Sequence, residues 1–150
     1  MLGQAVRGGG VWSYAVINLA HIVGVATLFG SVLVIDLRLL GLFARAPLAI
    51  VSMTTVPMAA AGFVLAAASG LCLLATNATE YAHNPFLLLK FGAIFVALLN
   101  VAVMCRMPAW RQRWSGPASS KQRAQLALGG GVSLAAWSTA LAAGRMLGYW

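Results

Sequence analysis

The chain has 150 residues, of which 61% are hydrophobic and only 8% are charged, and its formal net charge is +8. A typical soluble domain has about 25% charged residues, so too few charged side chains remain here to cover a water-facing surface. The composition therefore excludes an ordinary soluble protein and predicts an integral membrane protein. The basic excess does not indicate nucleic-acid binding, because no basic helix with interleaved aromatic residues accompanies it.

Four apolar segments are long enough to cross the hydrocarbon core of a bilayer, which takes about 20 residues of α-helix. The first two extend over about 12–43 and 48–76. The third covers about 85–107 and begins at Pro85, a residue well suited to the first turn of a helix. The fourth covers about 125–149. We therefore predict an all-α integral membrane protein, a four-transmembrane-helix bundle that forms one domain over residues 1–150.

The distribution of positive charge predicts how the chain is threaded. Seven of the ten basic residues lie in two short segments, namely Arg38, Arg45, Arg106, Arg111, Arg113, Lys121 and Arg123. Basic connections are retained in the cytoplasm, and an even number of spans places both termini on the opposite side. The expected arrangement is N-out and C-out, as a multi-pass protein of a bacterial inner membrane.

One histidine lies at membrane depth, where ionisable groups are costly and raise a functional hypothesis. His21 is expected about 10 Å below the outer interface, one helical turn after Asn18 on nearly the same face. Neutral imidazole binds haem iron, copper or zinc well. It can equally donate a hydrogen bond to a carbonyl and serve only in packing, so both roles stay open.

Two cations reach a similar depth from other segments. Lys90 lies early in the third segment and Arg145 near the outer end of the fourth, while Glu80 and His83 lie on the connection above. In one interpretation, both cations extend to the lipid headgroups and have no binding role. In the other, they form a polar binding site in the outer half of the bundle. It would bind a haem propionate, a quinone headgroup or a metal.

Three further polar residues are interpreted as structural. Asp36 and Arg38 are two residues apart and diverge on a helix, so Asp36 is expected to pair instead with a basic residue of the second basic segment, such as Arg106. Asn100 is expected to form a hydrogen bond between helices.

Several motifs are absent from the sequence. It contains no Cys-x-x-Cys pair, no haem-attaching Cys-x-x-Cys-His and no Ser/His/Asp set. Met53 and Met58 are five residues apart and lie on different faces of a helix, so copper handling by thioethers in the second segment is poorly supported. No nucleophile–base pair can be named, so we do not expect an enzyme.

Some of these runs resemble a known group. The run from His21 to Gly24, the run Asp36-Leu-Arg-Leu-Leu-Gly41 and the run Asn84–Lys90 resemble an uncharacterised family of small four-helix bacterial membrane proteins. The resemblance implies no activity. A more distant likeness, carried by His21 and Lys90, is to the membrane domain of the copper resistance D family. It implies handling of copper or haem at the periplasmic side.

The leading interpretation is a non-catalytic membrane subunit or anchor that binds b-type haem through His21 for electron transfer. Lys90 or Arg145 would hold the propionates, and His83 would be a second ligand. One alternative is a purely structural subunit of a larger membrane complex, or a self-associating one, whose partner contacts a stripe of small residues such as Gly62 to Gly70. Another is a copper or small-solute permease.

Overall fold

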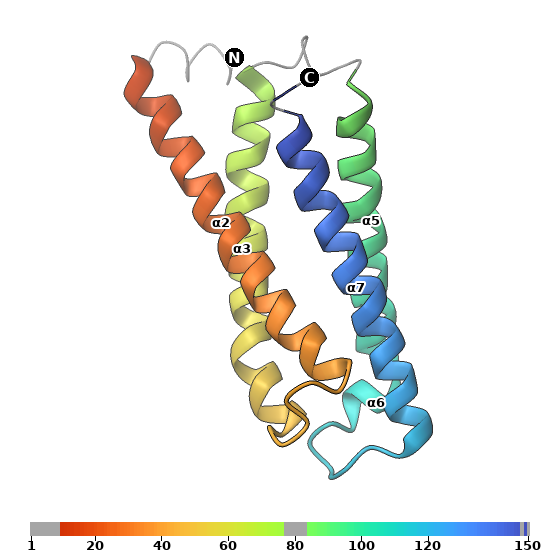
Figure 1. Cartoon of the computed structure of the whole chain (residues 1–150). Coiled ribbons are helices and arrows are strands. Elements are labelled where there is room, and N and C mark those ends of the chain that lie inside the picture. The colour runs from red at the N-terminus through yellow and green to blue at the C-terminus, as the bar shows by residue number, and fades with distance from the viewer. Residues whose placement is uncertain (1–9, 77–83, 148, 150) are drawn as a thin grey trace.

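The computed structural model describes residues 10–76, 84–147 and 149, and this part of the chain contains helices and connections without a strand. Its long helices are α2 (Gly10–Leu39), α3 (Leu48–Thr76), α5 (Pro85–Arg106) and α7 (Ser120–Met146), and α6 (Pro108–Arg111) is a single turn (Figure 1). All four long helices are apolar enough and long enough to cross a membrane. The all-α prediction with four candidate spans is therefore confirmed.

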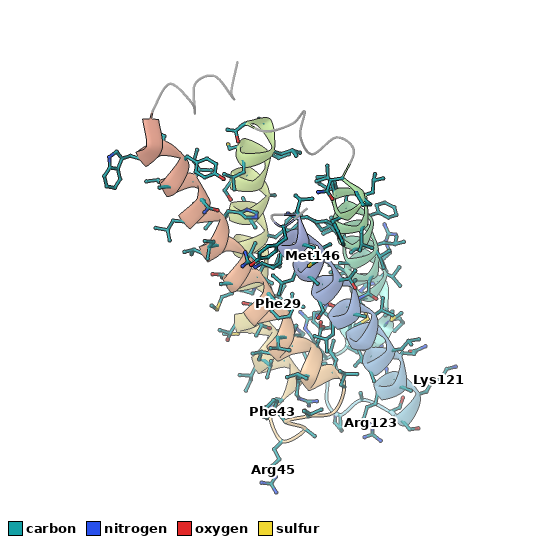
Figure 2. All side chains as sticks on the ribbon, turned by 45° about the horizontal axis from the view of Figure 1, so that its top comes forward. Phe29, Phe43, Arg45, Lys121, Arg123 and Met146 are labelled. Atoms are coloured by element: carbon teal, nitrogen blue, oxygen red, sulfur yellow. The ribbon has the colours of Figure 1, made fainter. Side chains whose placement is uncertain are left out.

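The helices form an open bundle. Helix α2 packs along α3 and also against α7, and α7 packs along α5, while α3 and α5 make at most marginal contact. The order in space is thus α3, α2, α7, α5. The start of α2 and the end of α7 lie at one end of the bundle (Figure 1). Arg45, Lys121 and Arg123 lie together at the other end (Figure 2), which we call the basic end.

Helix α2 ends at Leu39. The sequence had predicted that this helix would continue to about Phe43. The chain turns here because Gly41 has a φ of 100° and Phe43 a φ of 56°, both in the left-handed region that terminates helices. Arg38 holds the turn closed: its Nε donates to the carbonyl of Ala46 at 2.6 Å, and its Nη2 donates to the carbonyl of Ala44 at 3.3 Å.

Helix α7 begins at Ser120, five residues before the predicted start, and ends at Met146 rather than at 149. Its first turn is closed by a capping box that the sequence analysis missed. The hydroxyl of Ser119 accepts a hydrogen bond from the backbone of Gln122, whose side chain accepts one from the backbone of Ser119. Such a pair satisfies two amides that a helix otherwise leaves unbonded. Polar residues here therefore belong to the helix rather than to the preceding turn.

Close backbone contact joins α2 to α3. A Cβ built on Gly24 would lie 2.6 Å from the backbone nitrogen of Ala66, and one built on Gly62 would lie 2.5 Å from that of Leu28. Glycine is therefore required at both positions, because any side chain would force the helices apart. Small residues allow such an approach where lipid supplies no hydrophobic drive between helices.

The large apolar side chains are distributed as expected for a protein surrounded by lipid. Leu88, Leu128, Phe95 and Val64 are all at least 66% exposed, whereas Ala97 is fully buried. Two groups of buried residues form the interior: Leu28, Val32, Ala97, Ala136 and Trp137 in the middle of the bundle, and Ile35, Leu39, Met104, Ala109 and Leu126 toward the basic end.

Candidate functional site

His21 lies between α2 and α3 with a defined hydrogen-bond pattern. Its Nδ1 lies 2.9 Å from the carbonyl oxygen of Ala66 and 3.2 Å from the hydroxyl of Ser69. Because the Ser69 hydroxyl donates to the carbonyl of Leu65 at 2.5 Å, both neighbours of Nδ1 act as acceptors. The proton of a neutral ring therefore belongs on Nδ1, which leaves the lone pair of Nε2 available.

Lys90 lies within electrostatic range of His21, whereas Arg145 is turned away from them. The half-buried ammonium of Lys90 is close enough to His21 for an electrostatic interaction, and a Cβ on Gly144 would lie 3.6 Å from its Nζ. Arg145 is exposed and turned toward Tyr149, with its guanidinium 4.5 Å from the centre of the phenol ring. Part of the predicted outer cluster is therefore present.

The remaining polar residues predicted near the outer site do not add a described contact to it. Asn18 is exposed, while Glu80 and His83 lie outside the described residues. Within the described ranges, no group of three or more His, Cys, Asp or Glu side chains is placed to hold a metal ion. The outer site thus consists of one oriented imidazole and one nearby ammonium.

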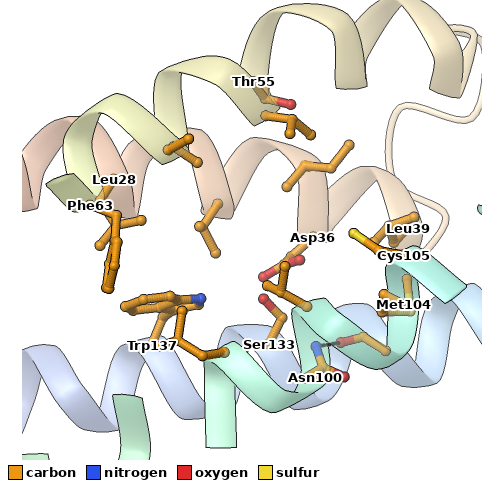
Figure 3. Close-up of a pocket in the computed structure, with 18 of the residues that line it drawn as sticks. Leu28, Asp36, Leu39, Thr55, Phe63, Asn100, Met104, Cys105, Ser133 and Trp137 are labelled. Carbon is orange, nitrogen blue, oxygen red and sulfur yellow. Dashed lines mark hydrogen bonds between the residues drawn. The ribbon is translucent and has the colours of Figure 1, made fainter. Parts of the chain in front are cut away.

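Asp36 differs most from its predicted role. It is only 2% exposed, whereas Arg106 is exposed, and the expected pair between them is not formed. The carboxyl points toward the hydroxyl of Ser133 on α7 (Figure 3). Its second oxygen, Oδ2, is buried and has no hydrogen-bond partner among the described residues. A buried carboxyl oxygen without a partner is costly, so Asp36 is not explained by structure alone.

A second buried polar atom lies beside the same cavity. The indole Nε1 of Trp137, a residue only 7% exposed, also has no partner in the described part of the chain. Trp137 and Asp36 both line a cavity with a volume of about 290 Å³. Their side chains are labelled in the close-up of this cavity (Figure 3). Its other lining residues are mostly apolar and come from all four long helices and α6, among them Leu28, Val32, Thr55, Phe63, Leu98, Met104 and Trp110.

The cavity opens on the apolar side of the bundle. Val56 on α3 and Leu98 and Val101 on α5 line it and are also 43%, 41% and 46% exposed. The mouth therefore lies between α3 and α5, the two helices that do not pack together. At the basic end Arg113, on the connection after α6, contacts α3: its Nε donates to the hydroxyl of Ser52 at 3.0 Å, and its guanidinium lies 4.4 Å from the ring centre of Trp110.

Asn100 also borders the cavity, but its amide is engaged. Its Nδ2 donates to the carbonyl of Gly129 at 3.0 Å, which is the bond between helices that the sequence predicted (Figure 3). Among the fully buried side-chain polar atoms of the described lining, the Asp36 Oδ2 and the Trp137 Nε1 are the ones without a partner.

Trp137 and Ser133 were missed by the sequence analysis. A tryptophan in the middle of a span was a usable signal, since its N–H needs an acceptor that apolar neighbours cannot supply. The run Gly129–Gly131 was another signal of close packing, because its missing side chains let Met104 and Leu39 pack directly against α7.

Comparison of the chain with protein-family models, curated proteins and solved structures gives no match. The resemblances drawn from the sequence therefore remain predictions.

Proposed function

We propose that the chain is a non-catalytic integral membrane protein that binds a small, largely apolar molecule inside the bilayer, in the cavity between α3 and α5. One observation carries this proposal: Asp36 and Trp137 both line the cavity, and each has a buried polar atom, Oδ2 and Nε1, without a hydrogen-bond partner among the described residues. Buried polar atoms in folded proteins are nearly always hydrogen-bonded, and a ligand would supply the missing bonds.

The cavity is large enough for such a molecule. An engineered apolar cavity of about 150 Å³ binds benzene, and the cavity here has about 290 Å³. Its mouth is lined by Val56, Leu98 and Val101, so a ligand would enter from the lipid phase without crossing an aqueous surface. A purely structural subunit would have no use for this opening.

Binding of a simple apolar probe tests the proposal. We expect saturable binding of fluorobenzene to the detergent-purified protein, measured by ¹⁹F NMR. Ala60 lines the mouth and is exposed, so the larger side chain in Ala60→Phe should block entry to the cavity. The signal of fluorobenzene with this variant then measures how much of the probe partitions into the detergent micelles alone. Identical signals from the native protein and Ala60→Phe would contradict the proposed function.

The second candidate function is the binding of b-type haem through His21, for electron transfer to a partner. The observation that favours it is the hydrogen bond from Nδ1 to Ala66, since metal-bound histidines usually donate their other ring N–H to a carbonyl or carboxylate. Lys90 would neutralise a propionate, and His83 would provide a second axial ligand. Copper is a weaker alternative for the same imidazole.

An absorption spectrum of the purified protein, oxidised and then reduced with dithionite, tests the haem candidate. We expect a Soret band with sharp reduced α and β bands that disappears in His21→Ala. Asn100→Leu is the control, because it changes a polar residue away from His21. A featureless spectrum without stoichiometric metal removes this candidate and leaves the cavity proposal unaffected.

We further propose that the protein lies in a bacterial inner membrane with both termini outside. This follows from the basic end, where Arg45, Lys121 and Arg123 gather (Figure 2). A structural subunit that docks through the Gly62 stripe is disfavoured, because Gly62 and Ala66 already contact α2 within the chain. A partner or second copy would have to use another face.

A further inference from the structure

We propose that the ligand of the cavity carries a hydroxyl group, which binds between the carboxyl of Asp36 and the indole N–H of Trp137. This inference rests on the proposed function and names the chemical class of the ligand: a neutral lipophile with one hydroxyl, such as a phenol or an alcohol. The rest of the molecule would occupy the apolar lining and extend toward the mouth.

The two unpartnered atoms have different requirements. The indole Nε1–H of Trp137 is a donor only and needs an acceptor. Oδ2 of Asp36 needs a donor when the carboxyl is ionised and an acceptor when Oδ2 carries the proton. A hydroxyl is the simplest substituent that meets both requirements in either state, because it has one O–H and two lone pairs.

Groups that only donate or only accept leave one of the two atoms without a partner when Asp36 is ionised. An ammonium has donors only, so it would pair with Asp36 and leave the Trp137 N–H unsatisfied. An ether or ketone has acceptors only, so it would leave an ionised Asp36 unsatisfied. A ligand carboxylate would oppose the ionised Asp36 with a like charge.

Both protein groups are held in place before any ligand binds. The Trp137 ring packs edge-on against Phe63, with ring centres 6.2 Å apart at an interplanar angle of 72°. It also belongs to the buried group with Leu28 and Ala136. Asp36 is buried in the last turns of α2 and faces Ser133 (Figure 3). Fixed partners reduce the conformational entropy that binding would otherwise cost.

Matched probes test the hydroxyl. Dissociation constants of 4-fluorophenol, 4-fluoroanisole and fluorobenzene would be measured by ¹⁹F NMR on the full-length protein in detergent, with Ala60→Phe giving each probe's partition into micelles. We expect 4-fluorophenol to bind at least about tenfold more tightly than 4-fluoroanisole, because only the phenol can donate a hydrogen bond to the ionised carboxyl of Asp36.

Variants then locate the bonds. Trp137→Phe keeps an aromatic ring but removes the N–H, and Asp36→Leu removes the carboxyl, so each should reduce the preference for 4-fluorophenol. Trp114→Phe is the matched control, because Trp114 is exposed on the connection before α7 and does not line the cavity. It should keep the full preference.

The outcomes separate this inference from the proposed function. If all three probes bind saturably with equal affinity, the hydroxyl assignment is overturned. Equal affinities are also the result expected if a water molecule, rather than the ligand, bridges Asp36 and Trp137. If none of the three probes binds saturably, the proposed function itself is overturned. The comparison of probes uses the native protein, so it stands even where a variant fails to fold.

Discussion

At the scale of single residues, two polar side chains on the cavity wall behave differently. Asn100 donates its amide hydrogen to the carbonyl of Gly129 and so joins α5 to α7. Asp36 faces Ser133 but keeps one oxygen buried without a partner. The first arrangement stabilises the fold, whereas the second costs stability in the absence of a ligand. A destabilising residue retained in a core is typical of a functional site.

The contrast between these residues predicts opposite effects on stability. In ligand-free protein, Asn100→Leu should lower the free energy of unfolding by about 0.6–1.7 kcal/mol, as loss of a hydrogen bond between membrane helices does. Asp36→Leu should raise it by about 1 kcal/mol, because it removes an unsatisfied buried oxygen and adds apolar contact beside the cavity. Reversible unfolding in mixed detergent would measure both. Equal destabilisation by both changes would show that Asp36 is structural.

At the scale of elements, contact between α2 and α3 depends on missing side chains. We expect Gly62→Ala to reduce the free energy of unfolding by about 1–3 kcal/mol, the usual effect of overpacking, because the added Cβ meets the backbone of Leu28. Gly92→Ala on α5 is the control, since nothing lies within 4 Å of a Cβ there. Thermal unfolding followed by circular dichroism should separate the two. A Gly62→Ala protein as stable as Gly92→Ala would contradict the close approach of these helices.

The start of α7 gives a second prediction at this scale. Ser119→Ala removes the hydroxyl that accepts from the backbone of Gln122, and loss of such a cap costs about 1 kcal/mol. Hydrogen exchange at the amides of residues 120–123 should accelerate, while exchange in α5 should stay unchanged. Unchanged exchange in the first turn would show that lipid or neighbouring segments hold α7 without the capping box.

At the scale of the whole molecule, the bundle is open on one side. Helices α3 and α5 do not pack along each other, and the cavity opens between them. Near the basic end, the connection after α6 is bonded to α3 through Arg113 and Ser52. A closed four-helix arrangement would bury the same residues without giving lipid-phase access. The binding proposal is therefore a consequence of helix arrangement more than of any one residue.

The orientation of the bundle is testable by thiol labelling. Ala118→Cys, in a chain whose Cys72 and Cys105 are replaced by alanine, places a single thiol in the connection before α7 at the basic end. We expect no reaction with a membrane-impermeant maleimide in intact cells and full reaction after lysis, because basic connections stay in the cytoplasm. Labelling of intact cells would reverse the proposed N-out and C-out arrangement.

The sequence by itself determined the class of this protein and the number of its long helices. Long apolar runs such as 48–76 have few other stable states, because backbone groups in lipid must bond within a helix. It also predicted that Asn100 would form a hydrogen bond between helices, which the structure shows.

Only the tertiary structure decided which residues share a cavity. The four spans are so uniformly apolar that their rotation about the helix axes leaves little trace in the sequence. Asp36 was therefore assigned to Arg106, although α2 turns it toward Ser133 and the cavity. Trp137 was overlooked for the same reason. Whether its indole N–H has a hydrogen-bond acceptor depends on which side chains surround it, and the packing of α2, α3, α5 and α7 decides this.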